Sequence, residues 1–297
     1  MINIVVTSKP CDGLFYYSYE YKSALKSLGM PVQVIVITHR KFKEQDYLDS
    51  INEKYIHCED IFFNNFNPEE NDTTLIMGRS MMTLGYQDFK EYTESQQETL
   101  KKVFSKNLIA VYSENHPTRY HQAVGFFNPA KIIDLCDTDV YPEAPTDLHF
   151  EKHINFTIHK DIVDDVKFEH LFLGTNDKYY ATVNSIIKDY PDHGIITYDE
   201  DYINENNNNV FAPVKNIMGM FKTYVYTKDT FDPAPRIFQE CRYFGKEVIY
   251  QRDKSIKDGG SVYWDRGLKD PDISNIAIAI KQFAGQKNVV PVKKEQV

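Results

Sequence analysis

Three charged residues are spaced so that they could bind a phosphorylated ligand: Asp232, Arg236 and Glu240. Asp232 opens the turn Asp-Pro-Ala-Pro, whose second proline suits the first turn of a helix because its missing N–H is not needed there. Arg236 and Glu240 are four residues apart and would share one helix face. The free N–H groups of a helix start favour phosphate, an arginine fork fits a diphosphate, and a glutamate could accept hydrogen bonds from a ribose diol. The alternative is a solvated salt bridge on an ordinary α/β helix.

The residues after Arg236 predict a helix followed by a strand of an α/β sheet. Gly245 ends the helix as a left-handed C-cap would, and Glu247–Tyr250 resumes as a buried strand. The helix has one apolar face, formed by Ile237, Phe238, Cys241 and Phe244.

Length and composition allow one large or two mid-sized domains with hydrophobic cores. The chain has 297 residues, 42% of them hydrophobic. It holds no run of about 18 apolar residues, so we expect no membrane span. The start, MINIVVTS, reads as a first β-strand and not as a signal peptide. The four cysteines are scattered, which predicts no zinc site and a cytoplasmic protein.

Charge is distributed unevenly along the chain. Residues 1–165 hold 16 Lys+Arg and 25 Asp+Glu, a net charge of −9, whereas residues 166–297 hold 18 of each. An acidic first half argues against non-specific attachment to nucleic acid, although it is compatible with a local basic strip beside an active site. The candidates for such a strip are Arg40, Lys41, Lys43, Arg79 and Arg119.

Strands and helices alternate along the chain, which predicts two Rossmann-like α/β domains facing a central cleft. We expect a first domain over 1–160, a second over 161–270, and a C-terminal helix and tail, 271–297, that crosses back to the first domain. Gly13, in the loop after the first strand, would let the backbone approach a substrate. The glycine fingerprint of dinucleotide-binding enzymes is absent from that loop. The predicted strands include 2–8, 32–38, 73–77, 107–112, 168–173, 194–198 and 222–226, and the predicted helices include 16–28 and 95–104.

Polar groups follow several of these strands, at the edge of a parallel sheet where ligands bind. Gly78-Arg79-Ser80 follows one strand, and Ser113–Pro117 follows another. Asp137 and Asp139 form a D-x-D triplet that could ligate Mg²⁺ or Mn²⁺, with a solvated strand end as the alternative. The polar run Asn204–Asn209 is expected to be an exposed loop.

The late helix resembles that of glycosyltransferases with the GT-B fold, many of which carry a carboxylate, seven residues and then a glutamate. Asp232 and Glu240 match that spacing, with aspartate in place of the usual first glutamate. The resemblance implies a hexosyl- or pentosyltransferase that uses a UDP-sugar donor. No metal is then obligatory, although a divalent metal is left open. Four stretches are also similar to the bacteriophage DNA β-glucosyltransferases, which modify hydroxymethylcytosine: TTLIMGRSMMTLG, SKNLIAVYSENHP, HLFLGTNDKYYATVNSII and APRIFQECRYFGKEVIY.

The second resemblance implies roles for individual residues. Glu114 stands at the place of those enzymes' catalytic aspartate and would take the proton of the acceptor hydroxyl. His116 competes for this role, because imidazole titrates near neutrality. The amides of Gly174 and Thr175 would hold the diphosphate together with Lys178, which stands where those enzymes offer arginines. A base at position 114 implies an inverting reaction, whereas the spaced acid pair is commoner among retaining members, so both courses stay open.

The same resemblance implies that Arg236 helps to hold the diphosphate, although one residue more than usual separates it from Glu240. The acceptor is left with three interpretations. The resemblance favours double-stranded DNA that carries 5-hydroxymethylcytosine or an already modified base. The acidic first half favours a glycan, a lipid or a small molecule, and a non-catalytic α/β binding protein is the third interpretation. We expect the chain to act as a monomer, in the host cytoplasm if a phage encodes it.

Overall fold

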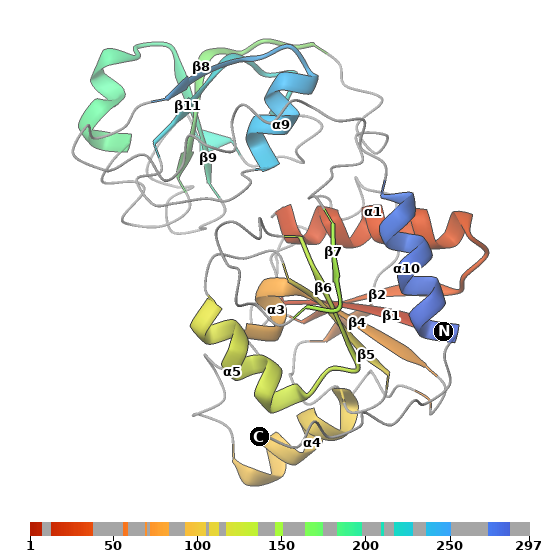
Figure 1. Cartoon of the computed structure of the whole chain (residues 1–297). Coiled ribbons are helices and arrows are strands. Elements are labelled where there is room, and N and C mark those ends of the chain that lie inside the picture. Colours follow the sequence, from red (N-terminus) through yellow and green to blue (C-terminus); the bar gives the residue numbers. More distant parts are fainter. Residues whose placement is uncertain are drawn as a thin grey trace. The chain divides into compact units, whose positions relative to one another are not determined.

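Two parallel β-sheets organise the computed structural model of the chain (Figure 1). The structure describes residues 1–7, 13–37, 56–58, 69, 72–82, 93–104, 107–112, 117–135, 146–150, 164–174, 183–197, 209–210, 217–227, 236–250 and 273–285. The chain divides into two compact units. Unit 1 comprises Met1–Lys43, Glu53–His153 and Asp272–Val297, and unit 2 comprises Glu44–Asn52 and Ile154–Pro271. The domain boundaries after residues 160 and 270 stay predictions.

Unit 1 contains a sheet whose described strands are all parallel, in the order β3-β2-β1-β4-β5-β6-β7. The central strands β1 and β4 are buried along their whole length, as expected for strands covered on both faces. Ile4 of β1 pairs with Val34 on one side and with Leu75 on the other. The strands are β1 (Ile2–Val6), β2 (Val32–Ile37), β3 (Ile56–Cys58), β4 (Thr73–Met77), β5 (Leu108–Tyr112), β6 (Lys131–Asp134) and β7 (Leu148–His149).

Helices form two layers on the first sheet. α1 (Gly13–Ser27) contacts β1, β2 and the C-terminal helix, whereas α5 contacts both α3 and α4. The strand order reverses at β1, so right-handed crossovers place α1 on the face opposite to α4 and α5. Gly29, two residues after the end of α1, has φ 77° and serves as its left-handed C-cap. The second layer consists of α3 (Gly78–Met82), α4 (Glu94–Phe104) and α5 (Pro117–Phe127).

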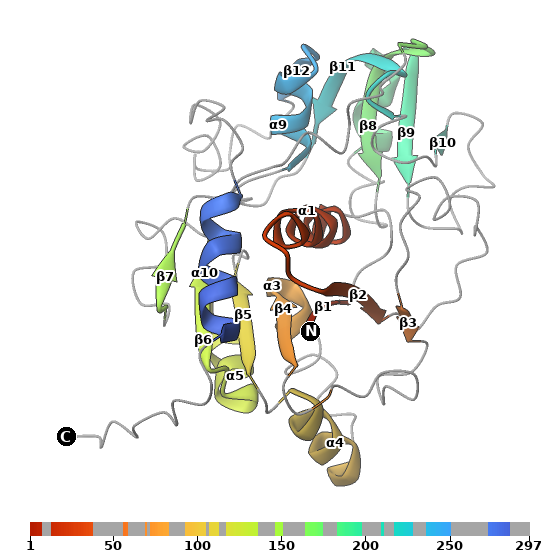
Figure 2. The same cartoon turned by 90° about the vertical axis from the view of Figure 1, so that its right-hand side faces the viewer.

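The C-terminal helix α10 (Ser274–Gly285) belongs to unit 1 and lies beside α1 (Figures 1 and 2). Its apolar face is fully buried, while Ile278 on the other face is 42% exposed. Lys281 Nζ donates a hydrogen bond of 2.9 Å to the carbonyl of Leu28, which follows the last turn of α1. This arrangement confirms the predicted helix that returns to the first domain. The buried residues of α10 are Ile276, Ala277, Ala279 and Ile280.

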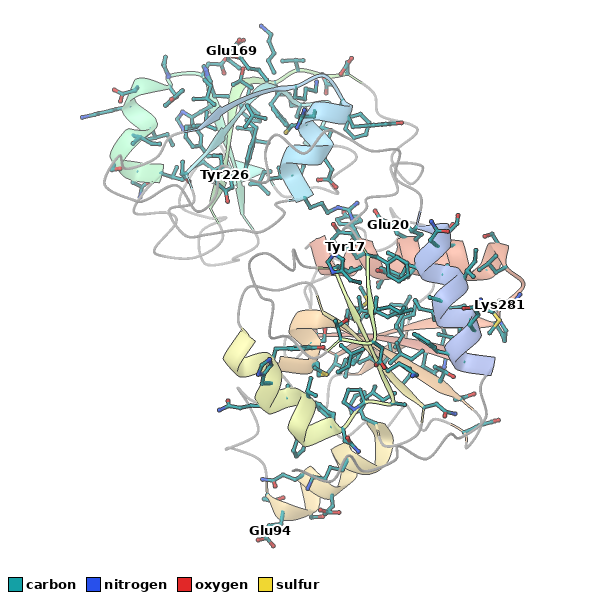
Figure 3. All side chains as sticks on the ribbon, viewed as in Figure 1. Tyr17, Glu20, Glu94, Glu169, Tyr226 and Lys281 are labelled. Carbon is teal, nitrogen blue, oxygen red and sulfur yellow. The ribbon has the colours of Figure 1, made fainter. Side chains whose placement is uncertain are left out.

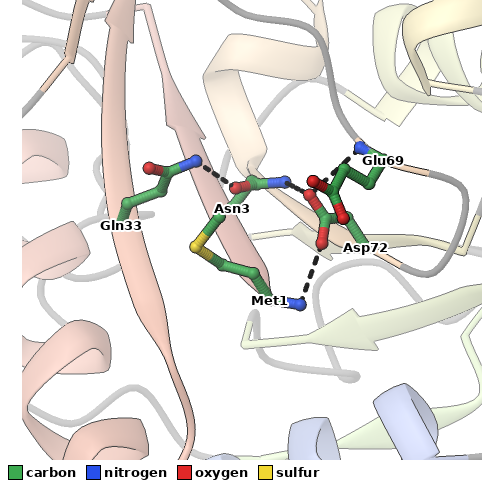
Figure 4. Close-up of polar contacts among 5 residues, drawn as sticks. All are labelled: Met1, Asn3, Gln33, Glu69 and Asp72. Carbon is green, nitrogen blue, oxygen red and sulfur yellow. Dashed lines mark hydrogen bonds and ion pairs between the residues drawn. The ribbon is translucent and has the colours of Figure 1, made fainter.

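A buried polar network joins the amino ends of three strands in unit 1 (Figure 4). Asp72 accepts hydrogen bonds from the Met1 amine (2.9 Å), the Asn3 side chain (3.2 Å) and the Glu69 amide (3.2 Å). Gln33 Nε2 donates to Asn3 Oδ1 at 2.6 Å. Burial raises the pKa of Asp72, but the hydrogen bonds from Met1, Asn3 and Glu69 outweigh it and hold the pKa below its ordinary value. The network therefore stabilises the register of β1, β2 and β4.

Unit 2 contains a smaller sheet with the order β10-β9-β8-β11-β12, and its described pairs are again parallel. One side of it packs around Phe172, Val183, Tyr190, Ile195 and Val225. The elements are β8 (Phe168–Gly174), the short helix η4 (Ile187–Asp189), β9 (His193–Thr197), β10 (Asn209–Val210), β11 (Phe221–Tyr226), α9 (Arg236–Tyr243) and β12 (Glu247–Tyr250).

The two sheets confirm the predicted α/β class with two Rossmann-like domains, and local predictions fail at four places. Gly78-Arg79-Ser80, expected as a loop, lies in α3. Gly13, also expected in a loop, is the first residue of α1. Asn209, expected in an exposed loop, pairs with Ile195 in β10. Helix α5 was not predicted at all, because polar and aromatic side chains obscure its apolar stripe.

Candidate active site

The carboxyl edge of the second sheet has the topology of a ligand-binding crevice. The strand order reverses between β8 and β11, and in open parallel sheets ligands bind outside the carboxyl ends at such a reversal. Gly174 ends β8 and Tyr226 ends β11. Tyr226 is 5% exposed and Thr227, the next residue, is 6% exposed. Figure 3 shows Tyr226 and Glu169 at opposite ends of this sheet.

Helix α9 begins on this same edge, because the chain leaves the carboxyl end of β11 and returns to the amino end of β12 through α9. The helix ends as predicted at Gly245, which has φ 66°. The Lys246 amide donates to the carbonyl of Cys241 at 2.8 Å, and the Gly245 amide donates to the carbonyl of Arg242 at 3.2 Å. This pair of hydrogen bonds is the Schellman motif, so the C-terminal end of α9 is set by the local sequence.

Arg236 and Glu240 form a buried ion pair on α9. Arg236 is its first residue, and its Nε donates to Glu240 Oε1 at 2.5 Å. The side chains are 7% and 2% exposed. The prediction that both residues share one helix face is confirmed. Because breaking a buried pair leaves an uncompensated charge, each partner depends on the other.

Cys241 follows Glu240 and is buried. Burial raises the pKa of the Cys241 thiol, and the neighbouring Glu240 carboxylate raises it further. Both effects disfavour the thiolate, which is the nucleophilic form of cysteine.

The first sheet has a corresponding reversal between β1 and β4. Thr7 follows β1, and its amide donates to the Ser80 hydroxyl at 2.8 Å. Ser80 is fully buried in α3. This hydrogen bond joins the segments that leave the two central strands at the carboxyl edge of unit 1.

Helix α1 carries buried polar side chains that the sequence reasoning did not single out. Glu20 is fully buried and Lys22 is 5% exposed. Burial, and then the nearby Tyr17 and Glu20, raise the pKa of Tyr21 above its usual range. Figure 3 shows Glu20 on the side of α1 turned away from the strands of unit 1. An acid inside the run YYSYEYK, in the middle of α1, is the sequence signal that could have marked this group.

The described residues include four of the predicted site residues: Gly13, Gly174, Arg236 and Glu240. The structure brings Arg236 and Glu240 together, and it places Gly174 at the end of β8 in the same unit. Glu114, His116, Thr175, Lys178 and Asp232 lie outside the described residues. So do Asp137 and Asp139 and the side chains of the predicted basic strip, which comprises Arg40, Lys41, Lys43, Arg79 and Arg119.

The described ranges contain no group of three or more His, Cys, Asp or Glu side chains that could hold a metal ion. No helix in the same ranges combines the length and the apolar character needed to cross a bilayer.

No protein-family model matches the chain, and no curated protein matches it in sequence. Solved structures match in fold. An alpha-glucosyltransferase in complex with UDP superimposes with a TM-score of 0.55 at 11% identity, covering 96% of this chain and 91% of that one. The alpha-glucosyltransferase with UDP and a 13-mer DNA gives 0.52 at 10% identity, covering 96% and 90%. A UDP-GlcNAc 2-epimerase from Neisseria meningitidis bound to UDP-GlcNAc gives 0.53 at 10% identity, covering 95% and 98%. The fold class is therefore GT-B, as predicted.

Proposed function

We propose that the chain is a glycosyltransferase that moves a sugar from a UDP-sugar to an acceptor hydroxyl. The observation that carries the proposal is the Arg236–Glu240 pair at the start of α9, on the carboxyl edge that borders the β8–β11 reversal. A helix start on this edge offers free N–H groups to a diphosphate. Structures of the same fold were solved with UDP or with UDP-GlcNAc, which supports a uridine nucleotide as the donor.

The proposed chemistry separates the donor side from the base. On the donor side, the amides of Gly174 and Thr175 and the Lys178 ammonium offset the charge that develops on the diphosphate. Asp232, Arg236 and Glu240 complete this side of the site.

Glu114 is the proposed base, with His116 as the competing one. In the sequence, Glu114 comes two residues after the last residue of β5. β5 is the neighbour of β4, which borders the β1–β4 reversal in unit 1. A base at this position gives an inverting displacement. The reaction needs no obligatory metal in this scheme. Activity that is lost in EDTA and restored by Mg²⁺ or Mn²⁺ would instead show that the enzyme depends on a divalent metal.

For the acceptor we propose 5-hydroxymethylcytosine, or an already modified base, in phage DNA. The support is the resemblance of four short stretches to phage DNA glucosyltransferases and the fold likeness to an alpha-glucosyltransferase that was solved with DNA. The acidic first half of the chain supports a glycan, lipid or small-molecule acceptor instead. A non-catalytic binding protein would share the fold and would transfer sugar to neither class of acceptor.

A second candidate function is 2-epimerisation of a UDP-sugar. The Neisseria meningitidis epimerase matches 95% of this chain at a TM-score comparable to that of the alpha-glucosyltransferase. Both functions bind a UDP-sugar, so donor binding alone does not separate them. Incubation with UDP-GlcNAc and no acceptor does, because an epimerase then forms the 2-epimer.

The first prediction concerns donor recognition. UDP at 100 times its Kd should stabilise the protein by about 2.7 kcal/mol by mass action, and ADP and GDP should stabilise it less. Thermal denaturation with each nucleotide measures this. Radiolabelled UDP-sugars are then offered with hydroxymethylcytosine DNA, with unmodified DNA of the same sequence, and with no acceptor.

The variant Glu114→Gln separates donor binding from the transfer step. It should keep the stabilisation by UDP and lose transfer, since only the base is removed. A fully active Glu114→Gln protein assigns the proton to another group, of which His116 is the first to test. No stabilisation by any nucleotide would contradict the proposed function.

A further inference from the structure

The geometry of Arg236 differs from that of a residue presented to a diphosphate. Its Nε points along α9 to Glu240 Oε1, one turn further into the helix. A phosphate clamp presents the guanidinium fork to its ligand, whereas here the Nε donor of Arg236 is engaged by a carboxylate of the same helix.

The Glu240 carboxylate depends on this contact. Glu240 is 1% exposed, and its sequence neighbour Cys241 is buried too. A buried carboxylate is stable as an anion only when it is paired and hydrogen-bonded, and the Arg236 guanidinium supplies both. The contact at Oε1 also fixes the rotation of the carboxylate, since one of its two oxygens is held.

We propose that Arg236 is a positioning residue, which holds the Glu240 carboxylate ionised and oriented for the ribose hydroxyls of the donor. This inference rests on the proposed function, because it assigns a role within the proposed donor site. It differs from the role that the sequence predicts, in which the Arg236 fork holds the diphosphate.

A series of three ligands distinguishes the two roles. Uridine, UMP and UDP share the ribose and differ in the number of phosphates. If Arg236 acts through Glu240, then Arg236→Met weakens all three by the same factor, about 10- to 100-fold for a lost charged hydrogen-bonding partner. If Arg236 holds the diphosphate, the loss is small for uridine and grows from UMP to UDP. Isothermal titration calorimetry at fixed pH and salt measures the three dissociation constants.

Non-additivity supplies a readout that a merely structural role would not move. In the Glu240→Ala background, Arg236→Met should add less than about a twofold further loss for any of the three ligands, since residues that act as one unit are not additive. Independent losses that multiply would overturn the proposal. Arg242→Met is the matched control, because Arg242 is an exposed arginine in the last turn of the same helix. This control should change no dissociation constant by more than about twofold.

A variant with a milder change keeps the test available if Arg236→Met does not fold. Arg236→Lys keeps a cation but lacks the Nε donor, so it should weaken the three ligands equally and by a smaller factor. A loss that grows with phosphate number in this variant overturns the positioning role. Wild-type protein that binds none of the three ligands contradicts the donor site itself, which separates the failure of the proposed function from the failure of this inference.

Discussion

Single buried carboxylates in this protein depend on hydrogen-bond donors from other residues, which lie near or far in the sequence. Asp72 receives hydrogen bonds from Met1 and Asn3, about seventy residues earlier in the chain. Glu240 receives one from Arg236 within its own helix. Both carboxylates are buried, and in both cases donors on other residues offset the loss of solvation.

The Asp72 network predicts a pH dependence of stability. The folded-state pKa of Asp72 lies below its ordinary value, so the stabilisation is complete above the unfolded pKa, about 4, and is lost as pH falls through the folded pKa. Asp72→Asn should lower the free energy of unfolding at pH 7 by about 1–3 kcal/mol. The difference from wild type should shrink at pH 3, as measured by urea denaturation at both values.

Asp165→Asn is the control for this prediction. Asp165 is an exposed carboxylate 3.5 Å from Lys167 and should matter by less than about 0.5 kcal/mol. An Asp72→Asn deficit that stays constant between pH 7 and pH 3 would contradict the charge-based explanation and leave only the altered shape.

At the scale of elements, helix ends are set locally and helix positions are not. Gly29 and Gly245 both adopt positive φ and end α1 and α9 with the same hydrogen-bond pattern. Along the chain, α9 connects β11 to β12, because two parallel strands need a crossover connection. The handedness of this crossover decides which face of the sheet α9 covers. The position of Arg236 at the carboxyl edge is thus a consequence of strand order.

A pair of glycine substitutions tests the role of the C-cap. Gly245→Ala should destabilise the protein by about 1 kcal/mol, because alanine is strained at φ 66° although no atom lies within 4 Å of an added Cβ. Gly125→Ala has the same open space but lies inside α5, so it should stabilise by about 0.5–1 kcal/mol. Chemical denaturation of both variants measures the effect, and equal signs would refute the explanation.

At the scale of the whole molecule, the chain builds unit 1 from segments at both of its ends. α10 packs on α1, and the hydrogen bond from Lys281 to Leu28 spans 253 residues of sequence. Unit 1 is therefore completed only after the strands of unit 2 have been passed. Such non-local contacts slow folding, because loop-closure entropy is lost before the contacts form.

Substitutions in α10 test this dependence. Ile280 is fully buried, so Ile280→Ala should cost about 2–5 kcal/mol and should speed amide hydrogen exchange in α1. Ile278→Ala on the exposed face of the same helix is the control and should change stability by less than about 0.5 kcal/mol. Hydrogen exchange that accelerates in α9 and not in α1 would contradict the packing of α10 against unit 1.

The sequence by itself determined the features that depend on near neighbours. Runs of β-branched residues predicted the buried strands, and Pro235 with Gly245 predicted the limits of α9. The spacing of Arg236 and Glu240 predicted their shared face, which the structure confirms. Local pattern failed at α3 and α5, where short or polar segments carry little periodicity.

Only the tertiary structure decided burial and partners. It showed that Arg236 turns to Glu240 and that both are buried, and it placed Asp72 under Met1 and Asn3. It also located the two points where strand order reverses, and hence the edges where a ligand would bind. The physical reason is that solvation and hydrogen bonding of a side chain depend on what surrounds it in space, and segments distant in sequence supply most of those surroundings.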